Sequence, residues 1–259
     1  MCFQRFLRWI LLINLIPRKN KQNIGANMFN DILCIIPARG GSKGIEHKNL
    51  QLVGDYPLFV HSVLHAIKNG IPKKQIVVSS DDGQILDIAK DLSVVSHKRS
   101  EVNSQDDSTT ESCLIEVLSF SIYDNINSVV TLQPTSPIRR KNLLHDCMYE
   151  YKSGGYDSLI TTTKLYDFLW YKLNENCKWL STYNYRNRPT RQNLEMRQIK
   201  YFDCGSIYIS NTQMLLSTGC RTGNNPCVFP ISMLESIQID DQNELKLVDL
   251  IFRGEIDKY

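Results

Sequence analysis

A glycine loop that carries two cations follows the apolar run at residues 32–36. Its sequence, PARGGSKG, occupies residues 37–44, and Lys48 and Asn49 come shortly after it. The glycines let backbone amides approach an anion closely, while Arg39 and Lys43 place two positive charges on one short segment. The spacing fits neither the Walker A pattern nor the dinucleotide-binding pattern. The loop therefore predicts a site for a phosphate-rich ligand such as a triphosphate, with an ordinary strand-to-helix turn as the alternative.

The composition is that of a globular chain with an even balance of charge. Of its 259 residues 42% are hydrophobic, enough for one large α/β domain or two small ones. The 30 basic and 27 acidic residues leave a net charge of +3, and no long basic run alternates with aromatic residues, so no nucleic-acid partner is expected. Eight cysteines without a C-x-x-C pair or nearby histidines argue against zinc and for free thiols in a cytoplasmic protein.

The first 27 residues differ from the rest of the chain. An apolar run of about eight residues, 9–16, contains Asn14 and is followed by a basic stretch, whereas a bilayer span needs roughly 20 apolar residues. A signal peptide would require a cleavage site of small residues after the apolar run, and none is present. We therefore expect residues 1–27 to be an N-terminal extension, disordered or not translated, ahead of a domain at 28–259 that begins near Met28. A weak interfacial anchor is the alternative, and stable membrane insertion is not expected.

Short apolar runs alternate with helical periodicity from residue 31 onward. The predicted strands are 32–37, 75–80, 94–96, 128–133, 158–163, 201–210 and 227–231, and the predicted helices are 57–69, 83–92, 108–123, 141–153, 212–217 and 243–252. This alternation predicts a mostly parallel sheet covered by helices on both faces, with ligands bound at the carboxyl ends of the strands. The glycine loop and residues 79–82 both follow strands and so fall at that edge. The polar, aromatic stretch 164–200 predicts an inserted arm that contacts substrate or another subunit.

Five segments in order along the chain resemble the acylneuraminate cytidylyltransferases, which make CMP-sialic acid, and their legionaminate and pseudaminate relatives. They are 36–44 with 48–49, 78–81, 132–139, 191–194 with 205–209, and 235–240. The resemblance implies a doubly wound, Rossmann-like α/β fold of the nucleotide-diphospho-sugar transferase type, with a dimerisation arm and hence a homodimer. It also implies that the anomeric hydroxyl of a nine-carbon, sialic-like (nonulosonic) acid attacks the α-phosphate of CTP and releases pyrophosphate.

The same resemblance assigns roles to residues by motif position. The nucleotide-binding set is Ala38, Arg39, Gly40, Gly41, Ser42, Lys43, Asn49 and Arg99; the sugar-binding set is Gln133, Arg191 and Tyr208; Asp240 and Gln238 would hold a divalent metal, Mg2+. Arg39, Lys43 and Asp240 would be catalytic, because charge builds up on the phosphoryl oxygens and on the departing pyrophosphate. Asn49 would contact the ribose, Arg99 the cytosine, and Arg191 the sugar carboxylate.

Some residues depart from the pattern that is usual in these enzymes. Gln238 replaces one of two acidic residues, which alternation would place on the same face as Asp240, so metal binding should be weaker. Cys204 and Asn193 replace an asparagine and an aspartate near the expected sugar pocket, which indicates a changed sugar preference or reduced activity. His47, beside the glycine loop, is predicted to be a solvated turn residue.

Each sugar-site residue also has a purely structural interpretation: Gln133 as a strand cap, Arg191 as a solvated charge and Tyr208 as core. Two other functions stay open. One is a nucleotidyltransferase for another nucleotide or sugar, and the other is a protein that binds a nucleotide or sugar nucleotide with little turnover. The fixed cations of the glycine loop disfavour the second, because a scaffold does not need them.

Overall fold

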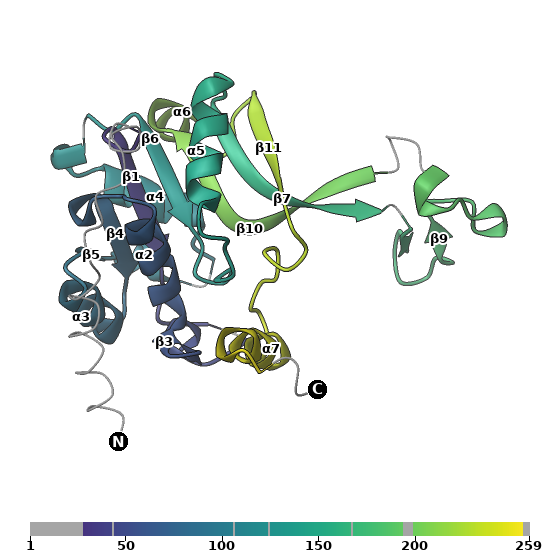
Figure 1. Ribbon diagram of the computed structural model, residues 1–259, viewed down its shortest axis with the longest axis horizontal. Coiled ribbons are helices and arrows are strands. Elements are labelled where there is room, and N and C mark those ends of the chain that lie inside the picture. The colour runs from purple at the N-terminus through teal and green to yellow at the C-terminus, as the bar shows by residue number, and fades with distance from the viewer. Residues whose placement is uncertain are drawn as a thin grey trace.

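The computed structural model describes residues 28–42, 44–105, 107–123, 125–166, 168–193 and 199–255. The extension expected at 1–27, and Lys43 of the glycine loop, lie outside these residues. Within them, seven strands form one sheet in the order β11-β7-β10-β6-β1-β4-β5 (Figure 1). The strands are β1 (Ile32–Pro37), β4 (Ile76–Ser80), β5 (Val95–Lys98), β6 (Ser128–Leu132), β7 (Ser158–Tyr166), β10 (Ile199–Asn211) and β11 (Pro226–Ile231). β10 runs antiparallel to both of its neighbours, and the other pairs are parallel.

Helices cover both faces of this sheet (Figure 1). On one face pack α2 (Leu58–Lys68), α3 (Gly83–Asp91) and α5 (Leu143–Ser153), and on the other α4 (Thr110–Leu118) and α6 (Thr212–Thr218). The central strands are buried on both sides because runs such as residues 32–36 are apolar at every position. The doubly wound, mostly parallel α/β fold predicted from the sequence is thereby confirmed.

The strands β1 and β4 end beside each other at one edge of the sheet. Pro37 lies opposite Ser79 in the parallel pairing, and the N–H of Ala38 donates to the Ser79 carbonyl at 2.9 Å. The segments that leave these two strands therefore start side by side. This is the carboxyl edge of the sheet, where ligands of open α/β folds bind.

The predicted boundaries of most helices and strands agree with the structure to within a few residues, and α4 is one exception. The helix expected at 108–123 ends at Leu118 and is followed by a short 3-10 turn, η4 (Ser121–Tyr123). The Ser119 hydroxyl donates to the Glu116 carbonyl at 2.7 Å. Such a local side-chain bond competes with the helical backbone bond and favours a helix end at this position.

The strands β7 and β10 are the second exception, because both extend further than predicted and leave the sheet together. Their pairing continues outward to Tyr166 and Ile199, past an irregularity where Gly205 adopts a positive φ of 63°. Figure 1 shows them as a ribbon that projects from the body and ends in residues 168–193. Those residues contain the short strands β8 (Trp170–Tyr171) and β9 (Leu180–Ser181). We call residues 164–200 the arm.

The C-terminal helix α7 (Gln242–Arg253) packs against the chain that follows the glycine loop. Together they bury a small separate core of Ile45, Val53, Leu58, Ile239, Leu245 and Val248. The hairpin of β2 (Leu52–Val53) and β3 (Tyr56–Pro57) is bound to the same helix, since the N–H of Gly54 donates to the Asp249 carboxylate at 2.7 Å. This core holds residues 238–240 beside the glycine loop.

The seven cysteines within the described residues are free thiols, most of them buried. In the same part of the chain, no helix has both the length and the apolar character needed to cross a bilayer.

Gly44 tests the contact between the glycine loop and residues 238–240. A Cβ at residue 44 would overlap the backbone carbonyl oxygen of Asp240, whereas a Cβ at Gly41 would meet no atom within 4 Å. Gly44→Ala should therefore lower the free energy of unfolding by about 1–3 kcal/mol, as overpacking does, in urea titrations followed by circular dichroism. Gly41→Ala is the matched control and should change it by less than about 0.5 kcal/mol. Equal stability of the two variants would contradict the contact.

Candidate active site

The glycine loop is fixed by hydrogen bonds to residues that are distant in the sequence. The N–H of Gly40 donates to the Asp81 carboxylate at 2.8 Å, and the side-chain amide of Asn49 donates to the Arg39 carbonyl at 2.8 Å. A Cβ added at Gly40 would lie 2.8 Å from the Cβ of Asp82. The loop can therefore approach the segment after β4 this closely only with glycine at position 40.

Asp82 connects the loop to helix α3. One of its carboxylate oxygens accepts the N–H of Gln84 at 2.8 Å and that of Ile85, which caps the helix. The other oxygen lies 3.8 Å from Nδ1 of His47. His47 is exposed and has a left-handed backbone with φ 46°. It thus occupies the tight turn through which the chain leaves the glycine loop.

Asn49 carries an acceptor that the protein itself does not satisfy. The residue is 8% exposed, and its Oδ1 atom is buried and has no hydrogen-bond partner among the described residues. An unsatisfied buried polar atom costs about 1–3 kcal/mol. A ligand hydroxyl beside the loop would remove this cost, which fits the ribose contact expected of Asn49.

Lys48 ties the glycine loop to the segment before α7. Its ammonium donates to the Ile239 carbonyl at 2.9 Å and to Oδ1 of Asp240 at 3.1 Å. Arg39 is partly buried, and its guanidinium reaches the carbonyl of Gln105 at 3.5 Å. Arg39 and Lys48 therefore place two cations at the glycine loop. The Asp240 side chain is 68% exposed despite its ion pair with Lys48.

Residues 238–240 alternate in exposure. Ile239 is buried and its N–H donates to the Thr135 carbonyl at 2.8 Å, whereas Gln238 is partly exposed and packs on Gly205. Within the described ranges, no group of three His, Cys, Asp or Glu side chains could hold a metal ion. One carboxylate and one amide suit a Mg2+ ion that takes its remaining ligands from phosphate oxygens and water.

Arg99 reaches the carboxyl edge of the sheet from β5. It is 8% exposed, its backbone N–H donates to the Ser80 carbonyl at 2.9 Å, and its Nε donates to the Ser79 hydroxyl at 3.1 Å. In the part of the chain that the structure describes, no carboxylate pairs with this guanidinium. The guanidinium of Arg99 is therefore held by a neutral hydroxyl of β4, the strand next to β1.

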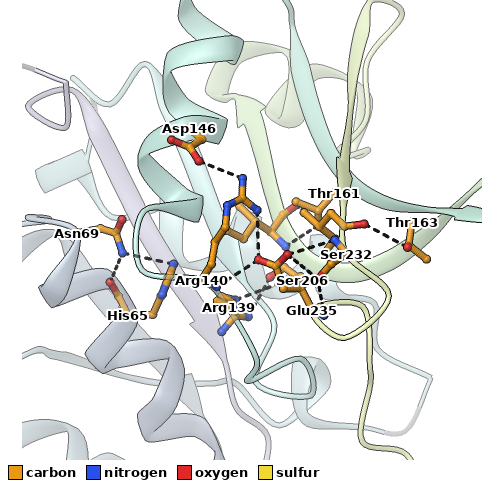
Figure 2. Close-up of polar contacts among 12 residues, drawn as sticks. His65, Asn69, Arg139, Arg140, Asp146, Thr161, Thr163, Ser206, Ser232 and Glu235 are labelled. Atoms are coloured by element: carbon orange, nitrogen blue, oxygen red, sulfur yellow. Dashed lines mark hydrogen bonds and ion pairs between the residues drawn. The ribbon is translucent and has the colours of Figure 1, made fainter.

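Arg139 fixes the backbone where β6 ends (Figure 2). Its guanidinium donates to the Gln133 carbonyl at 2.7 Å and to the Ser206 carbonyl at 2.9 Å. It also donates to the hydroxyls of Ser206 and Ser62, at 3.2 and 3.0 Å. Burial lowers the pKa of Arg139 to about 10, so it stays charged at neutral pH. Gln133, the expected sugar ligand, is thus positioned through its own carbonyl.

Arg140 points the other way and joins two acidic residues, as Figure 2 shows. It pairs with Glu235 at 3.1 Å and with Asp146 of α5 at 3.0 Å. Glu235 also accepts the Ser232 hydroxyl at 2.7 Å. Burial would raise the pKa of Glu235, but the hydrogen bonds from Ser232 and Arg140 hold it below its usual value. This cluster anchors the chain that leads to residues 238–240.

Tyr208 lies in the interior of the sheet. It is 3% exposed, its hydroxyl donates to Asp203 at 2.6 Å, and the Arg221 guanidinium lies 4.0 Å from its ring centroid. Burial raises the pKa of Tyr208 above its ordinary value. Cys204 is likewise buried, and its thiol donates to the Thr161 carbonyl at 3.1 Å. Both side chains are therefore buried and hydrogen-bonded within the fold.

Arg191 belongs to the arm and lies far from Gln133 within one chain. It is exposed and its guanidinium lies 5.0 Å from the ring centroid of Tyr166. Tyr166 pairs with Ile199, seven residues before Ser206, whose carbonyl accepts the N–H of Gln133 at 3.4 Å. Because seven residues of an extended strand span roughly 23 Å, Arg191 beside Tyr166 and Gln133 beside Ser206 lie at opposite ends of this part of β10.

The comparisons with known proteins assign the family. A family model described as Cytidylyltransferase matches residues 33–202. The chain belongs to the cytidylyltransferase family. The family predicted from the five sequence segments is thus confirmed.

Individual cytidylyltransferases are similar over most of the chain. N-acylneuraminate cytidylyltransferase of Streptococcus agalactiae serotype V is 27% identical over 215 residues, which are 82% of this chain and 51% of that protein. Pseudaminic acid cytidylyltransferase of Campylobacter jejuni is 27% identical over 229 residues, 85% of this chain and 96% of that protein. The chain thus spans about half the length of the first curated relatives it matches.

A solved structure supports the fold of this cytidylyltransferase. CMP:2-keto-3-deoxy-manno-octonic acid synthetase complexed with CTP matches with a TM-score of 0.60 at 15% identity, over 88% of this chain and all of that one. At this identity the match concerns the fold, and it agrees with the sheet and helices described above.

The structure brings the described members of the expected nucleotide-binding set to one edge of the sheet. It also identifies three supporting residues for which the sequence analysis predicted no role. Asp81 holds Gly40, Lys48 holds residues 239–240, and Arg139 holds Gln133. All three stand inside the segments that resemble the family, which was the available signal. Their partners are more distant in the sequence or are backbone atoms, so the sequence did not reveal what they contact.

Arg139 gives a stability test of this site. Arg139→Lys removes the planar fork that contacts two carbonyls at once, so it should lower the free energy of unfolding by about 2 kcal/mol, measured by urea denaturation. Arg253→Lys is the control: Arg253 is exposed and pairs with Asp249 one turn earlier on α7, so little change is expected. A wild-type midpoint for Arg139→Lys would show that the fork does not support the end of β6.

Proposed function

We propose that this protein transfers CMP from CTP to a nine-carbon, nonulosonic sugar acid and releases pyrophosphate. The observation that carries the proposal is the glycine loop of a cytidylyltransferase, held by Asp81 and Asn49 and flanked by Arg39 and Lys48. The names of the similar proteins, which include N-acylneuraminate and pseudaminic acid cytidylyltransferases, support the class of sugar. Which sugar acid is used depends on residues outside this loop.

The proposed roles follow the charge that the reaction moves. The sugar's anomeric oxygen bonds to the α-phosphorus as the bond from that phosphorus to the β-phosphate bridge breaks, and the hydroxyl proton is released. Arg39 and Lys43 would hold the phosphates and stabilise the charge on the departing pyrophosphate. Gly40 and Gly41 would permit close approach, Ser42 would donate to a phosphate, and Asn49 would accept from the ribose. Charge neutralisation by Mg2+, contacted by Asp240 and Gln238, would complete the site.

The proposal includes a homodimer in which the arm serves the neighbouring copy. The arm exposes large apolar side chains, among them Leu173, Trp179 and Tyr185, which are 73%, 61% and 55% exposed. Aromatic surface of this kind is typical of interfaces. Because Arg191 lies on the arm and away from Gln133, it would meet a sugar carboxylate in the site of the second copy.

Pyrophosphate release tests the reaction. The assay would use CTP, Mg2+ and a panel of N-acetylneuraminic, legionaminic, pseudaminic and 3-deoxy-manno-octulosonic acids. We expect release with one acid, loss of that release on chelation of the metal, and a decrease of about 100-fold or more in kcat for Arg39→Ala. The control Arg253→Ala should retain wild-type activity. CTP binding without release for any acid would favour a nucleotide-binding protein with little turnover, for which the amide at Gln238 would be the cause.

Mixing two inactive variants tests the dimer and the role of the arm. Arg39→Ala disables the loop of its own chain, and Arg191→Ala disables an arm that acts on the partner. A mixed dimer keeps one intact site if the arm acts across the dimer, so equal mixing after subunit exchange should restore about a quarter of wild-type activity. Sedimentation velocity would verify the dimer. No restoration in a verified mixed dimer would contradict an arm that acts on the second copy.

A further inference from the structure

A buried hydroxyl, that of Ser79, receives three side chains from different parts of the fold. Ser79 is the fourth residue of β4 and is fully buried. His97 of β5 approaches it with Nδ1 at 2.9 Å, Arg99 with Nε at 3.1 Å, and Cys113 of α4 with its sulfur at 3.2 Å. None of these contacts is needed to close the sheet, because β4 and β5 already pair through their backbones.

The number of protons on these groups fixes their orientation. A serine hydroxyl has one proton to donate and two lone pairs to accept with. Arg99 can only donate, and the Cys113 thiol also donates, so both lone pairs are occupied. The proton of Ser79 then goes to Nδ1 of His97, which must be an unprotonated acceptor. His97 is therefore neutral, with its hydrogen on Nε2.

The second nitrogen of His97 faces an acid that holds the chain next to Arg99. Nε2 lies 3.8 Å from Oε1 of Glu116, and Glu116 accepts the N–H of Ser100 at 2.7 Å and the side-chain amide of Asn103 at 2.5 Å. Burial would raise the pKa of Glu116, but the hydrogen bonds from Asn103 and Ser100 lower it below its usual value. Arg99 is thus held from both sides, by Ser79 at its side chain and by Glu116 at the following residue.

The terminal nitrogens of Arg99 are what this arrangement leaves for a ligand. Its Nε is taken by the Ser79 hydroxyl. The residue as a whole is only 8% exposed, yet its terminal nitrogens are not among the buried atoms of the described residues that lack a partner, so they remain accessible to a ligand. A guanidinium that is fixed at Nε and has no carboxylate partner among the described residues can offer its remaining N–H groups to a ligand that carries acceptors. A cytosine ring, with an acceptor oxygen next to an acceptor nitrogen, matches the planar fork.

We propose that Ser79, His97 and Glu116 form a positioning relay that holds Arg99 in place to recognise the base of the pyrimidine nucleotide. This inference rests on the proposed use of CTP. The three residues touch no substrate themselves and act through Arg99. Cys113 supplies a further hydrogen bond to the same hydroxyl.

The relay makes nucleotide binding depend on the protonation of His97. A proton on Nδ1 would turn this nitrogen into a third donor toward Ser79, which has only two lone pairs, and would put a positive charge beside Arg99. The charged and titratable groups that face His97 are Glu116 and Cys113 of α4 and Arg99 after β5, while Phe120 packs edge-on at 5.6 Å. Burial lowers the pKa of His97 below its ordinary 6.5. The contribution of His97 to nucleotide affinity should therefore be constant at neutral and higher pH, and it should be lost as the pH falls through the lowered pKa of His97.

Calorimetric titration of the full chain with CTP and with UTP tests the relay without any sugar acid. Ser79→Ala should raise the Kd for CTP about tenfold at pH 7.5, the effect of losing one hydrogen bond to a charged group, and should lower the preference for CTP over UTP. Arg99→Ala sets the maximum loss. Ser128→Ala, a buried serine at the other end of β6 from the site, is the matched control and should leave both values within about twofold.

His97→Gln separates positioning from simple packing. The glutamine oxygen can accept the Ser79 proton but does not titrate, so the Kd at pH 7.5 should stay within about threefold. As the pH is lowered below 6.5, the Kd of the wild type should rise more steeply than that of His97→Gln, because protonation of the CTP phosphates affects both proteins alike. If Ser79→Ala does not fold, this variant decides alone. Wild-type affinity and base preference in folded Ser79→Ala, or a wild-type pH profile in His97→Gln, would overturn the relay.

The two proposals fail in different ways. A wild-type protein that binds CTP in preference to UTP but releases no pyrophosphate with any sugar acid would refute the proposed reaction and leave the relay standing. A wild-type protein that binds neither nucleotide would refute both. Release of pyrophosphate by a protein whose Ser79 and His97 variants behave as wild type would refute the relay alone.

Discussion

The hydrogen bond from the Gly40 N–H to Asp81 is the constraint on which the candidate site depends. It joins the loops that follow two parallel neighbours, β1 and β4, and it is possible because a side chain at position 40 would meet Asp82. Once the glycine loop is held there, Asn49 and Lys48 come within reach of Arg39 and of residues 239–240. The site is thus a consequence of strand order at the carboxyl edge of a parallel sheet.

Arginines in the body of the fold fall into two groups, those paired with carboxylates and those held by neutral oxygen atoms. Arg140 and Arg221 pair with carboxylates, Glu235 and Glu111, and serve the packing of the fold. Arg99 and Arg139 are held instead by hydroxyls and carbonyls, and in the described residues neither has an acidic partner. Cations fixed by neutral groups keep a positive potential in a buried place. Such a potential suits a cytidylyltransferase whose co-substrate carries several negative charges.

The arm is stabilised differently from the seven-stranded sheet and its helices. Its strands complete each other's backbone hydrogen bonds as a two-stranded ribbon, so they need no sheet beneath them. Its surface is rich in exposed aromatic side chains and in arginines that lie over them, such as Arg188 over Phe168 at 4.3 Å. A ribbon of this length is marginal alone in water, and in the proposed homodimer the second copy would bury what it exposes.

The sequence by itself determined the order and type of the elements, the edge at which the ligand loop lies and the family. These follow from local periodicity and from motifs that are continuous in the sequence, such as residues 36–44. Only the tertiary structure decided which side chains meet. Lys48 contacts a residue 192 positions away, and Arg139 one 67 positions away, while Tyr208 and Cys204 turn into the core and Arg191 moves out on the arm. Such contacts depend on strand order and register, which no local pattern encodes because pairing joins segments that are far apart in the chain.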